Sequence, residues 1–334
     1  MRSGDINMLK PNSKLAEQQA SNRSNKRHDV ASDLFTQHEA FGTKNQFTVG
    51  IEHEYGLVNA FTGQPVNAFD EVYDDLEPSI QQRCTNEFLG CQIEFATGVH
   101  EDVESAAGEV IEIDTELIRV CDRLGLRVLR SGTFPDWKFD PALIHDCERS
   151  RRNLQRFGGE VAGLACNSMH VHVQVSRDDA IAVMDRLMCH VPRWVAMSAN
   201  SPSMYGHGGK FASHRAMVWG REGAITGFPY RFGGSWEAYY YEIARLHSAG
   251  LVETQKDAYF MVRPTRFGTI EVRCCDIPVD LQTTIAIAEE IQAAAINAVG
   301  DTSPMPSLEQ LTEDFGGACR LGRQWLRRGE PSLN

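Results

Sequence analysis

The sequence predicts an α+β fold in which helices pack on an antiparallel sheet, and two observations support this prediction. The first is that strand-like and helical segments follow each other irregularly and repeat with no fixed period, unlike the βαβ order of a parallel sheet. The second is the clean alternation of residue types that begins at Phe47, which is typical of a half-buried strand.

The first strand is the clearest of five expected strands. Val49, Ile51 and Leu57 point to one of its faces, and Glu52 and Glu54 point to the other. The other strand-like segments are 87–97, 126–129, 169–175 and 262–276.

Helix signals separate these strands. Residues 102–124 carry apolar side chains at positions i, i+3 and i+4, which predicts an amphipathic helix. Ser176 is expected to cap a helix over 177–198, with Asp179 in the reciprocal position of a capping box. The remaining expectations are a basic helix at 149–156, a helix from Asp280 to about Val299, and a long glycine-rich loop at 205–234.

One main domain, 46–300, is expected between two terminal segments. Residues 1–45 are polar and slightly basic without a sustained period, so they are expected to form a flexible tail. Residues 301–334 are expected to pack on the domain or to trail from it.

Composition excludes several classes of partner. With 33 Lys and Arg against 45 Asp and Glu, the net charge of −12 is unfavourable for binding nucleic acid or anionic lipid. No apolar run is long enough to cross a membrane, and none near the N-terminus resembles a signal peptide. Nine cysteines without a C-x-x-C pair are typical of reduced thiols, so a cytoplasmic location is expected.

Acidic pairs lie on two of the strands. Glu52 and Glu54 share a strand face, about 7 Å apart, and would repel each other unless a cation neutralises them or one is protonated. A solvent-facing strand edge would give the same pattern. Glu87 and Glu94 have opposite parity, so they could meet only if a bulge or turn at Gly90 changed the register.

Histidines and an arginine lie on two further strands. His170, His172 and Gln174 share one face, an arrangement that suits metal or phosphate binding, although buried core histidines would give the same pattern. Glu271 and Arg273 also share a face, and they are either a structural ion pair or a metal ligand beside a phosphate clamp.

Together these segments favour a site for a nucleoside triphosphate with divalent cations. A set of glutamates and one or two histidines, without cysteine, suits Mg²⁺ or Mn²⁺ better than zinc. Positive charge for phosphate oxygens is available from Arg215, Arg263, Arg266 and Arg273. Neither a G-x-x-x-x-G-K-S/T loop nor a kinase signature is present, so neither motif would hold the nucleotide.

Six motifs occur in order over about residues 47–300. They are G-I-E-H-E-Y-G-L-V-N from residue 50, Glu87 followed by E-x-x-T from residue 94, H-V-H-V from 170, S-A-N-S-P from 198, A-S-H-R from 212, and R-P-x-x-F-G-T-I-E-V-R from 263. Taken together, they resemble the carboxylate–amine ligases related to type 2 glutamate–cysteine ligase. The run N-S-M-H-V-H from 167 also resembles a strand of glutamine synthetase.

The resemblance implies a glutamine-synthetase-like catalytic fold, in which a curved antiparallel sheet forms a funnel backed by helices. It also implies an ATP- and Mg²⁺-dependent (or Mn²⁺-dependent) ligase. ATP would phosphorylate the carboxylate of a small molecule, an amino acid such as glutamate, and an amine would displace phosphate to form an amide. Phosphoryl transfer between anions depends on cations and positioning, which this residue set offers.

A homodimer is the predicted assembly of the chain.

Roles for individual residues follow from the same resemblance. The implied metal ligands are Glu52 and Glu54 on different ions, Glu87 and Glu94 completing one site, and His170 and Glu271 completing the other. The implied nucleotide contacts are His172, Gln174 and Arg266. The implied catalytic arginines are Arg263, Arg273 and Arg215. The implied substrate contacts are Thr97, Asn200, Ser213 and Lys210.

Two other functions compete with this one. A metal-dependent hydrolase built on the His-x-His strand is disfavoured, because no glutamate follows the pair at three or four residues and no H-E-x-x-H motif occurs. A degenerate homologue that binds a nucleotide or metabolite without turnover would be favoured by loss of a metal glutamate, and none is lost. The loop at 208–211, Gly-Gly-Lys-Phe, replaces the family's Asp-Thr-Gly-Tyr, so the resemblance indicates the reaction class better than the substrate.

Overall fold

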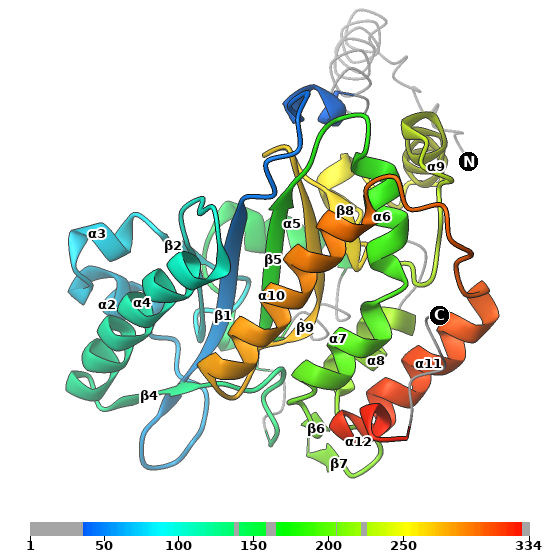
Figure 1. Ribbon diagram of the computed structural model, residues 1–334. Coiled ribbons are helices and arrows are strands. Elements are labelled where there is room, and N and C mark those ends of the chain that lie inside the picture. The colour runs from blue at the N-terminus through cyan, green and yellow to red at the C-terminus, as the bar shows by residue number, and fades with distance from the viewer. Residues whose placement is uncertain (1–35, 137–139, 158–164, 205, 222–225, 329–334) are drawn as a thin grey trace, which may run out of the picture.

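A seven-stranded sheet forms the centre of the computed structural model, which describes residues 36–136, 140–157, 165–204, 206–221 and 226–328 (Figure 1). The strand order is β2-β3-β1-β5-β9-β8, and β4 pairs with the second half of β1. Every pairing among these strands is antiparallel, which confirms the expected fold class. The strands are β1 (Val49–Asn59), β2 (Cys84–Asn86), β3 (Gln92–Ala96), β4 (Leu126–Leu129), β5 (Ser168–Gln174), β8 (Val262–Pro264) and β9 (Thr269–Asp276), with a separate hairpin of β6 (Ser203–Met204) and β7 (His207–Gly208).

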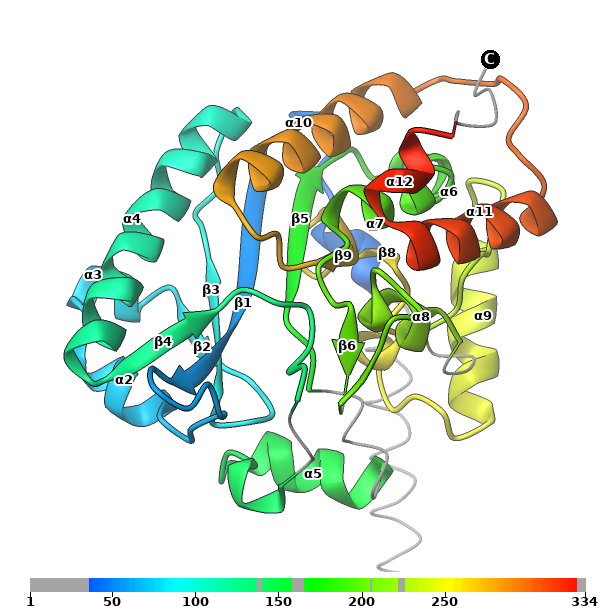
Figure 2. The ribbon, with the colours of Figure 1, turned by 90° about the horizontal axis from the view of Figure 1, so that it is seen from below.

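Helices α4, α6, α7 and α10 cover one face of the sheet. Figure 2 shows α4 and α10 on one side of the strands and α5 on the other. The main core lies between the sheet and these helices, where Val171 and Val272 of the strands meet Leu187 and Ile291 of the helices. The helices are α2 (Phe69–Asp75), α3 (Pro78–Gln81), α4 (Val103–Arg123), α5 (Glu148–Phe157), α6 (Ala180–Met188), α7 (Val191–Ser198), α8 (His214–Arg221), α9 (Trp236–Ser248), α10 (Leu281–Ala298), α11 (Leu308–Leu321) and α12 (Arg323–Leu326), with 3-10 turns at Gln37–Ala40, Pro141–Leu143 and Gln255–Asp257.

The segment 262–276 is a hairpin and not the single strand that the sequence predicted. Strand β8 ends at Pro264 and β9 begins at Thr269. The turn closes when Gly268 N–H donates to the Thr265 carbonyl (3.3 Å), and Gly268 has a φ of 73°, a conformation that favours glycine. The strand alternation of the flanking residues conceals this turn in the sequence.

The helix predicted over 177–198 is divided into α6 and α7. Ser176 Oγ donates to Asp179 Oδ2 (2.7 Å), and α6 begins only at Ala180. Pro192 lies in the first turn of α7, where its missing N–H is tolerated, so the chain starts a new helix there. The loop predicted over 205–234 contains the helix α8, while residues 205 and 222–225 lie outside the described residues.

The predicted boundary of the tail at residue 45 is wrong for its last ten residues. His38 Nδ1 lies 2.7 Å from the Tyr240 hydroxyl on α9, and Phe41 is buried in the main core. The rest of the predicted tail, 1–35, lies outside the described residues. At the other end, α11 and α12 pack on α7, so the C-terminal segment packs on the domain as far as it is described.

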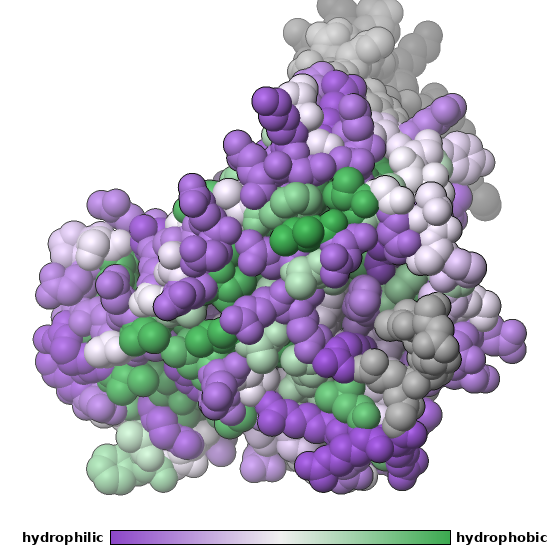
Figure 3. Space-filling model, in the orientation of Figure 1, coloured by the Kyte–Doolittle hydropathy of each residue, from purple (hydrophilic) through white to green (hydrophobic). Residues whose placement is uncertain are grey.

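The helical face of the molecule mixes hydrophilic and hydrophobic side chains (Figure 3). The exposed large apolar residues on these two helices are Ile111 (47% exposed) and Ile118 (44%) on α4 and Ile296 (47%) on α10. A homodimer stays a prediction. Within the described residues, no helix has the length and apolar character needed to span a membrane.

Gly220 on α8 lies against Phe315 of α11, and an added Cβ would lie 2.4 Å from the buried Phe315 ring. We therefore expect Gly220→Ala to lower the free energy of unfolding by about 1–3 kcal/mol, as overpacking does. The control is Gly108→Ala on α4, where the new Cβ has no described heavy atom within 4 Å apart from its chain neighbours and the backbone of its own helix. It should raise the free energy of unfolding by up to about 1 kcal/mol. Urea denaturation measures both, and a destabilised control or an unaffected Gly220→Ala would contradict the packing argument.

Candidate metal and phosphate site

Half of the site lies where β3, β1 and β5 are neighbours. In the strand register Glu54 lies opposite Glu94, and Glu52 lies opposite His170. These side chains share the sheet face turned away from the main core, because residues two apart on a strand point to the same side. His170 Nδ1 is 2.9 Å from Glu52 Oε2, and His170 Nε2 is 3.6 Å from Glu54 Oε1.

The other half lies where β5, β9 and β8 are neighbours. His172 lies opposite Glu271, which in turn lies opposite Arg263. His172 Nε2 is 3.1 Å from Glu52 Oε1 and 3.9 Å from Glu271 Oε1. Its other ring nitrogen, Nδ1, is 2.8 Å from Thr269 Oγ1, and this contact fixes the orientation of the imidazole.

Glu271 is held between two arginines. Arg263 Nε donates to Glu271 Oε2 (2.5 Å), and Arg273 donates to Glu271 Oε1. Burial would raise the pKa of Glu271, but the charges of Arg263 and Arg273 outweigh burial and hold its pKa well below the usual range. Both guanidinium groups also lie over the Tyr259 ring, at 5.8 and 6.0 Å from its centroid. The two arginines are therefore a fixed positive element beside the histidines.

The carboxylates around His170 have opposite pKa shifts. Burial opposes the ionisation of Glu52, yet its contacts with His170 and His172 hold its pKa well below the usual range. Burial, together with the negative charges of Glu87 and Glu52, raises the pKa of Glu94. The cluster thus has more carboxylate than its histidines can balance, which is the condition that a bound cation relieves.

A turn at Gly90 brings Glu87 next to Glu94. Gln92 N–H donates to the Leu89 carbonyl (3.0 Å), and the strand β3 begins only after this turn. The side chain of Glu87 is within hydrogen-bonding reach of Glu94. The structure thus has, at Gly90, the turn that the sequence required for the two glutamates to meet.

Two groups of three side chains could each hold a metal ion, and their ligand atoms lie within 4.8 Å of one another. Glu52, Glu94 and His170 form the first group, and Glu52, His172 and Glu271 form the second. Among the described residues, His172 Nε2 is a buried nitrogen without a hydrogen-bond partner, although carboxylate oxygens surround it. The residues present therefore fit divalent cations that prefer oxygen ligands, with Glu52 able to bridge two of them.

Glu54 and Glu87 lie beside these two groups and not in them. Glu54 Oε2 accepts hydrogen bonds from the backbone N–H (2.8 Å) and the hydroxyl (2.5 Å) of Ser168. The roles of Glu54 and Glu87 as metal ligands stay predictions.

Three residues expected to contact substrate are bonded to the protein itself. Asn200 N–H and Ser213 Oγ donate to the two carboxylate oxygens of Asp276, at 2.8 and 2.9 Å. Thr97 Oγ1 accepts from the N–H of Ile51 (2.9 Å). The Asn200 side-chain amide also donates to the carbonyls of Arg130 (2.8 Å) and Ile277 (3.0 Å). The roles of these three residues as substrate contacts stay predictions.

Arg215 and Gln174 are also engaged within the protein. Arg215 is 5% exposed and donates to the carbonyls of Arg273 (3.0 Å) and Cys274 (3.3 Å), so it supports β9, and its catalytic role stays a prediction. The Gln174 amide donates to the Lys44 carbonyl (3.1 Å) and anchors the chain entering β1. Contact of Gln174 with a nucleotide stays a prediction.

Lys210 and Arg266 are exposed. Arg266 lies in the β8–β9 turn, with its guanidinium 4.8 Å from the centroid of the Phe267 ring. The Phe267 ring is in turn 6.4 Å from that of His172. The expected roles of Arg266 and Lys210 stay predictions.

Sequence reasoning missed three residues of the site. Ser168 binds Glu54, Thr269 orients His172, and the Tyr259 ring underlies two arginines. Strand parity carried a signal for Ser168, which lies two residues before His170 on the same face. No sequence signal marked Tyr259, because its contact depends on the path of the chain before β8.

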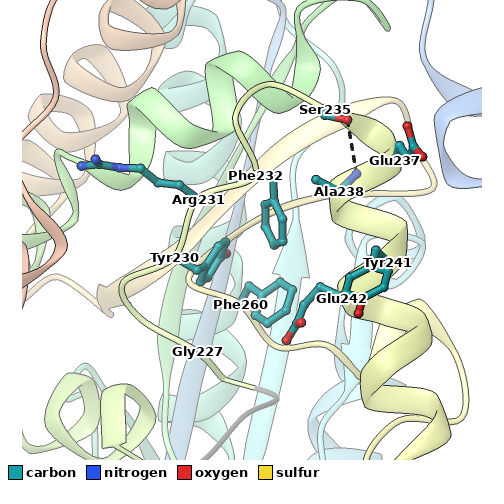
Figure 4. A pocket seen from close by; sticks show the side chains of 10 residues that line it. All are labelled: Gly227, Tyr230, Arg231, Phe232, Ser235, Glu237, Ala238, Tyr241, Glu242 and Phe260. Atoms are coloured by element: carbon teal, nitrogen blue, oxygen red, sulfur yellow. Dashed lines mark hydrogen bonds between the residues drawn. The ribbon is translucent and has the colours of Figure 1, made fainter.

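A cavity of about 670 Å³ opens elsewhere, between α9 and the segment that follows residue 226. Figure 4 shows aromatic rings on one of its walls and α9 side chains on the other. The lining includes Tyr230, Phe232, Phe260, Tyr241 and Glu242. None of the predicted site residues lines this cavity. The cluster of glutamates and histidines on the sheet is therefore the candidate site because of its chemistry, and not because it lies in this cavity.

Most of the chain matches the sequence model of one protein family. Residues 48–326 match the family described as glutamate–cysteine ligase family 2. A protein assigned as glutamate–cysteine ligase 2 in Enterobacter sp. (strain 638) is 31% identical over 265 residues, covering 76% of this chain and 69% of that protein. Another in Paenarthrobacter aurescens (strain TC1) is 29% identical over 307 residues, covering 85% and 78%.

Two solved structures resemble the fold, each with a TM-score of 0.60. One is a glutamate–cysteine ligase from Francisella tularensis in complex with AMP, 13% identical, covering 85% of this chain and 72% of that one. The other is a bifunctional glutathione synthetase from Pasteurella multocida, 14% identical, covering 89% and 44%. At these identities the likeness concerns the fold. The specific likeness to glutamine synthetase that the His170 strand implied is not supported by these two structures.

Proposed function

The chain belongs to glutamate–cysteine ligase family 2, a family of amide-bond-forming ligases, and from this premise we propose that it is an ATP-dependent carboxylate–amine ligase requiring Mg²⁺ or Mn²⁺. The proposed substrates are ATP, the carboxylate of an amino acid such as glutamate, and an amine. The proposed products are an amide, ADP and phosphate.

The sharing of Glu52 between two cation-binding groups carries this proposal. It sits in both groups, and Glu271 of the second group is tied to Arg263 and Arg273. Phosphoryl transfer between two anions is limited by charge repulsion and by positioning, so paired cations next to arginines suit that reaction. The Francisella tularensis ligase holds AMP, which supports nucleotide binding on this fold.

In the first proposed step, a carboxylate oxygen attacks the γ-phosphorus of ATP, and the bond from that phosphorus to the β,γ-bridging oxygen breaks to release ADP. Glu52, His170 and His172 would hold the cations, which when bound neutralise the phosphate charge. Arg263 and Arg273, fixed by Glu271, would donate their remaining N–H groups to the transferred phosphoryl group or the substrate carboxylate.

In the second step the amine attacks the acyl carbon of the acyl phosphate. The carbon–oxygen bond to phosphate breaks, phosphate leaves, and the nitrogen loses a proton to give the amide. Positioning of the two substrates supplies much of the acceleration in such a reaction, since no protein nucleophile is required.

A product-resolved assay tests the proposal. The protein is incubated with ATP, Mg²⁺ and pairs of amino acids and amines, ADP is followed with time, and products are identified by mass spectrometry. We expect ADP and amide in equal amounts for at least one pair, and neither in the presence of EDTA. Undiminished turnover in EDTA would contradict the metal requirement, and nucleotide binding without turnover across the panel would favour a degenerate binding homologue.

Lys210 gives a prediction about specificity. It places an exposed positive charge where the resembled family has glycine. We expect it to favour an anionic substrate group, and at an exposed position the effect is up to about fivefold in selectivity. Lys210→Gly should raise the KM of the preferred acidic substrate by about two- to fivefold, and cysteine should be a poor acceptor for the unmodified enzyme. Steady-state kinetics with unchanged KM values, or γ-glutamylcysteine as the best product, would contradict the prediction.

A further inference from the structure

Ser168 connects β1 and β5, two of the three strands that carry the first cation-binding group. It is 2% exposed at the start of β5. Its hydroxyl lies 2.5 Å from Glu54 Oε2 on β1 and 2.9 Å from His170 Nε2 on its own strand. Its backbone N–H adds a second hydrogen bond to the same Glu54 oxygen, at 2.8 Å.

The chemistry of the partners fixes the direction of these hydrogen bonds. A carboxylate accepts and cannot donate, so Ser168 gives its one hydroxyl hydrogen to Glu54. The hydroxyl oxygen is then an acceptor toward His170, and Nε2 must be the donor. A neutral His170 with its hydrogen on Nε2 carries its lone pair on Nδ1.

Nδ1 is the nitrogen of His170 that faces the rest of the cluster. It lies 2.9 Å from Glu52 Oε2 and 3.6 Å from Glu271 Oε1, whereas Nε2 faces Glu54 and Ser168. A lone pair beside two carboxylate oxygens is unfavourable unless a positive charge lies among them, either a metal ion or, without one, a second proton on Nδ1 that makes the hydrogen bond to Glu52. When a metal ion takes the place of that proton, Nδ1 is the atom that binds it.

We infer that Ser168 is a positioning residue for the cation site: its hydroxyl holds His170 in the tautomer with hydrogen on Nε2, and so presents Nδ1 to the metal while it fixes Glu54. This inference rests on the proposed function, because it concerns the same cation site. Partners that orient a metal-binding histidine typically contribute 10- to 100-fold to metal affinity.

The first test measures metal affinity without nucleotide. Mn²⁺ is titrated into the protein, and free Mn²⁺ is followed by its electron paramagnetic resonance signal. Ser168→Ala is expected to weaken binding about 10- to 100-fold. Ser168→Thr, which keeps the hydroxyl, should restore it to within about threefold. The matched control is Ser198→Ala, since Ser198 is also 2% exposed but donates only to backbone carbonyls on α7, and its affinity should not change.

The second test observes the tautomer directly and needs no activity. Nitrogen-15 NMR of histidine-labelled protein with Mg²⁺ bound should show hydrogen on Nε2 of His170, assigned by the signal missing from His170→Asn. In Ser168→Ala this preference should be lost. A serine that merely filled space would leave the tautomer unchanged.

The outcomes separate this inference from the proposed function. Absence of Mn²⁺ binding in the unmodified protein would overturn the proposed cation site and this inference with it. Normal Mn²⁺ binding in the unmodified protein, with equal affinity in Ser168→Ala or with hydrogen on Nδ1 of His170, would overturn only the role of Ser168. Weaker binding in Ser168→Ala with rescue by Ser168→Thr would support it.

Discussion

Glu52→Gln is expected to lower the kcat of the proposed ligase reaction at least about 100-fold, the scale on which loss of a preorganised electrostatic group acts. Glu52 belongs to both cation-binding groups and lies 2.9 Å from His170 and 3.1 Å from His172. Glutamine keeps the shape of the side chain and removes the charge, so both cations should bind more weakly. No other single substitution in the cluster touches both groups.

Turnover and Mn²⁺ affinity should therefore fall together in this variant, while the far-ultraviolet circular dichroism spectrum stays unchanged. Glu290→Gln is the matched control, because Glu290 on α10 pairs with Arg193 on α7 and is in neither cation-binding group. Near-normal turnover of Glu52→Gln, or an equal loss in Glu290→Gln, would remove Glu52 from the site.

Arg273→Lys is expected to lower kcat by about 100-fold with a small change in melting temperature. Lysine keeps the positive charge that balances the buried Glu271, and Arg263 still holds that carboxylate. It loses the planar fork that can bind a carboxylate or phosphoryl group through two parallel N–H groups. Catalysis should therefore suffer more than stability.

The alternative, that Glu271 and Arg273 form only a structural ion pair, predicts the opposite pattern. A variant that melts several degrees lower and turns over normally would support that alternative. Arg193→Lys is the control, since Arg193 also binds a carboxylate through two N–H groups, at 2.7 Å each, on the helical side of the molecule. It loses the same fork and should keep full activity.

The sequence by itself determined the strands that carry the chemistry. In β1 and β5 a period of two separates core residues from Glu52 and His170, and a one-residue slip would bury the charged side chains in the main core. This local constraint is strong enough to assign each side chain to a face. The sequence also indicated that Glu87 could meet Glu94 through a turn at Gly90, and the structure has this turn.

Only the tertiary structure decided which of these side chains meet. Glu52 and His170 are 118 positions apart, and their contact depends on the pairing of β1 with β5. The same is true of Arg215, which lies on α8 and donates to the Arg273 carbonyl, 58 positions away along the chain.

Strand order and register follow from the packing of the whole core, and a local pattern of residues does not contain them. The two groups that could hold a cation therefore differ from the expected sets, with Glu52 shared and His172 included. Asn200 and Ser213 likewise donate hydrogen bonds to Asp276. A buried carboxylate needs such donors, and these two come within its reach only in the folded chain.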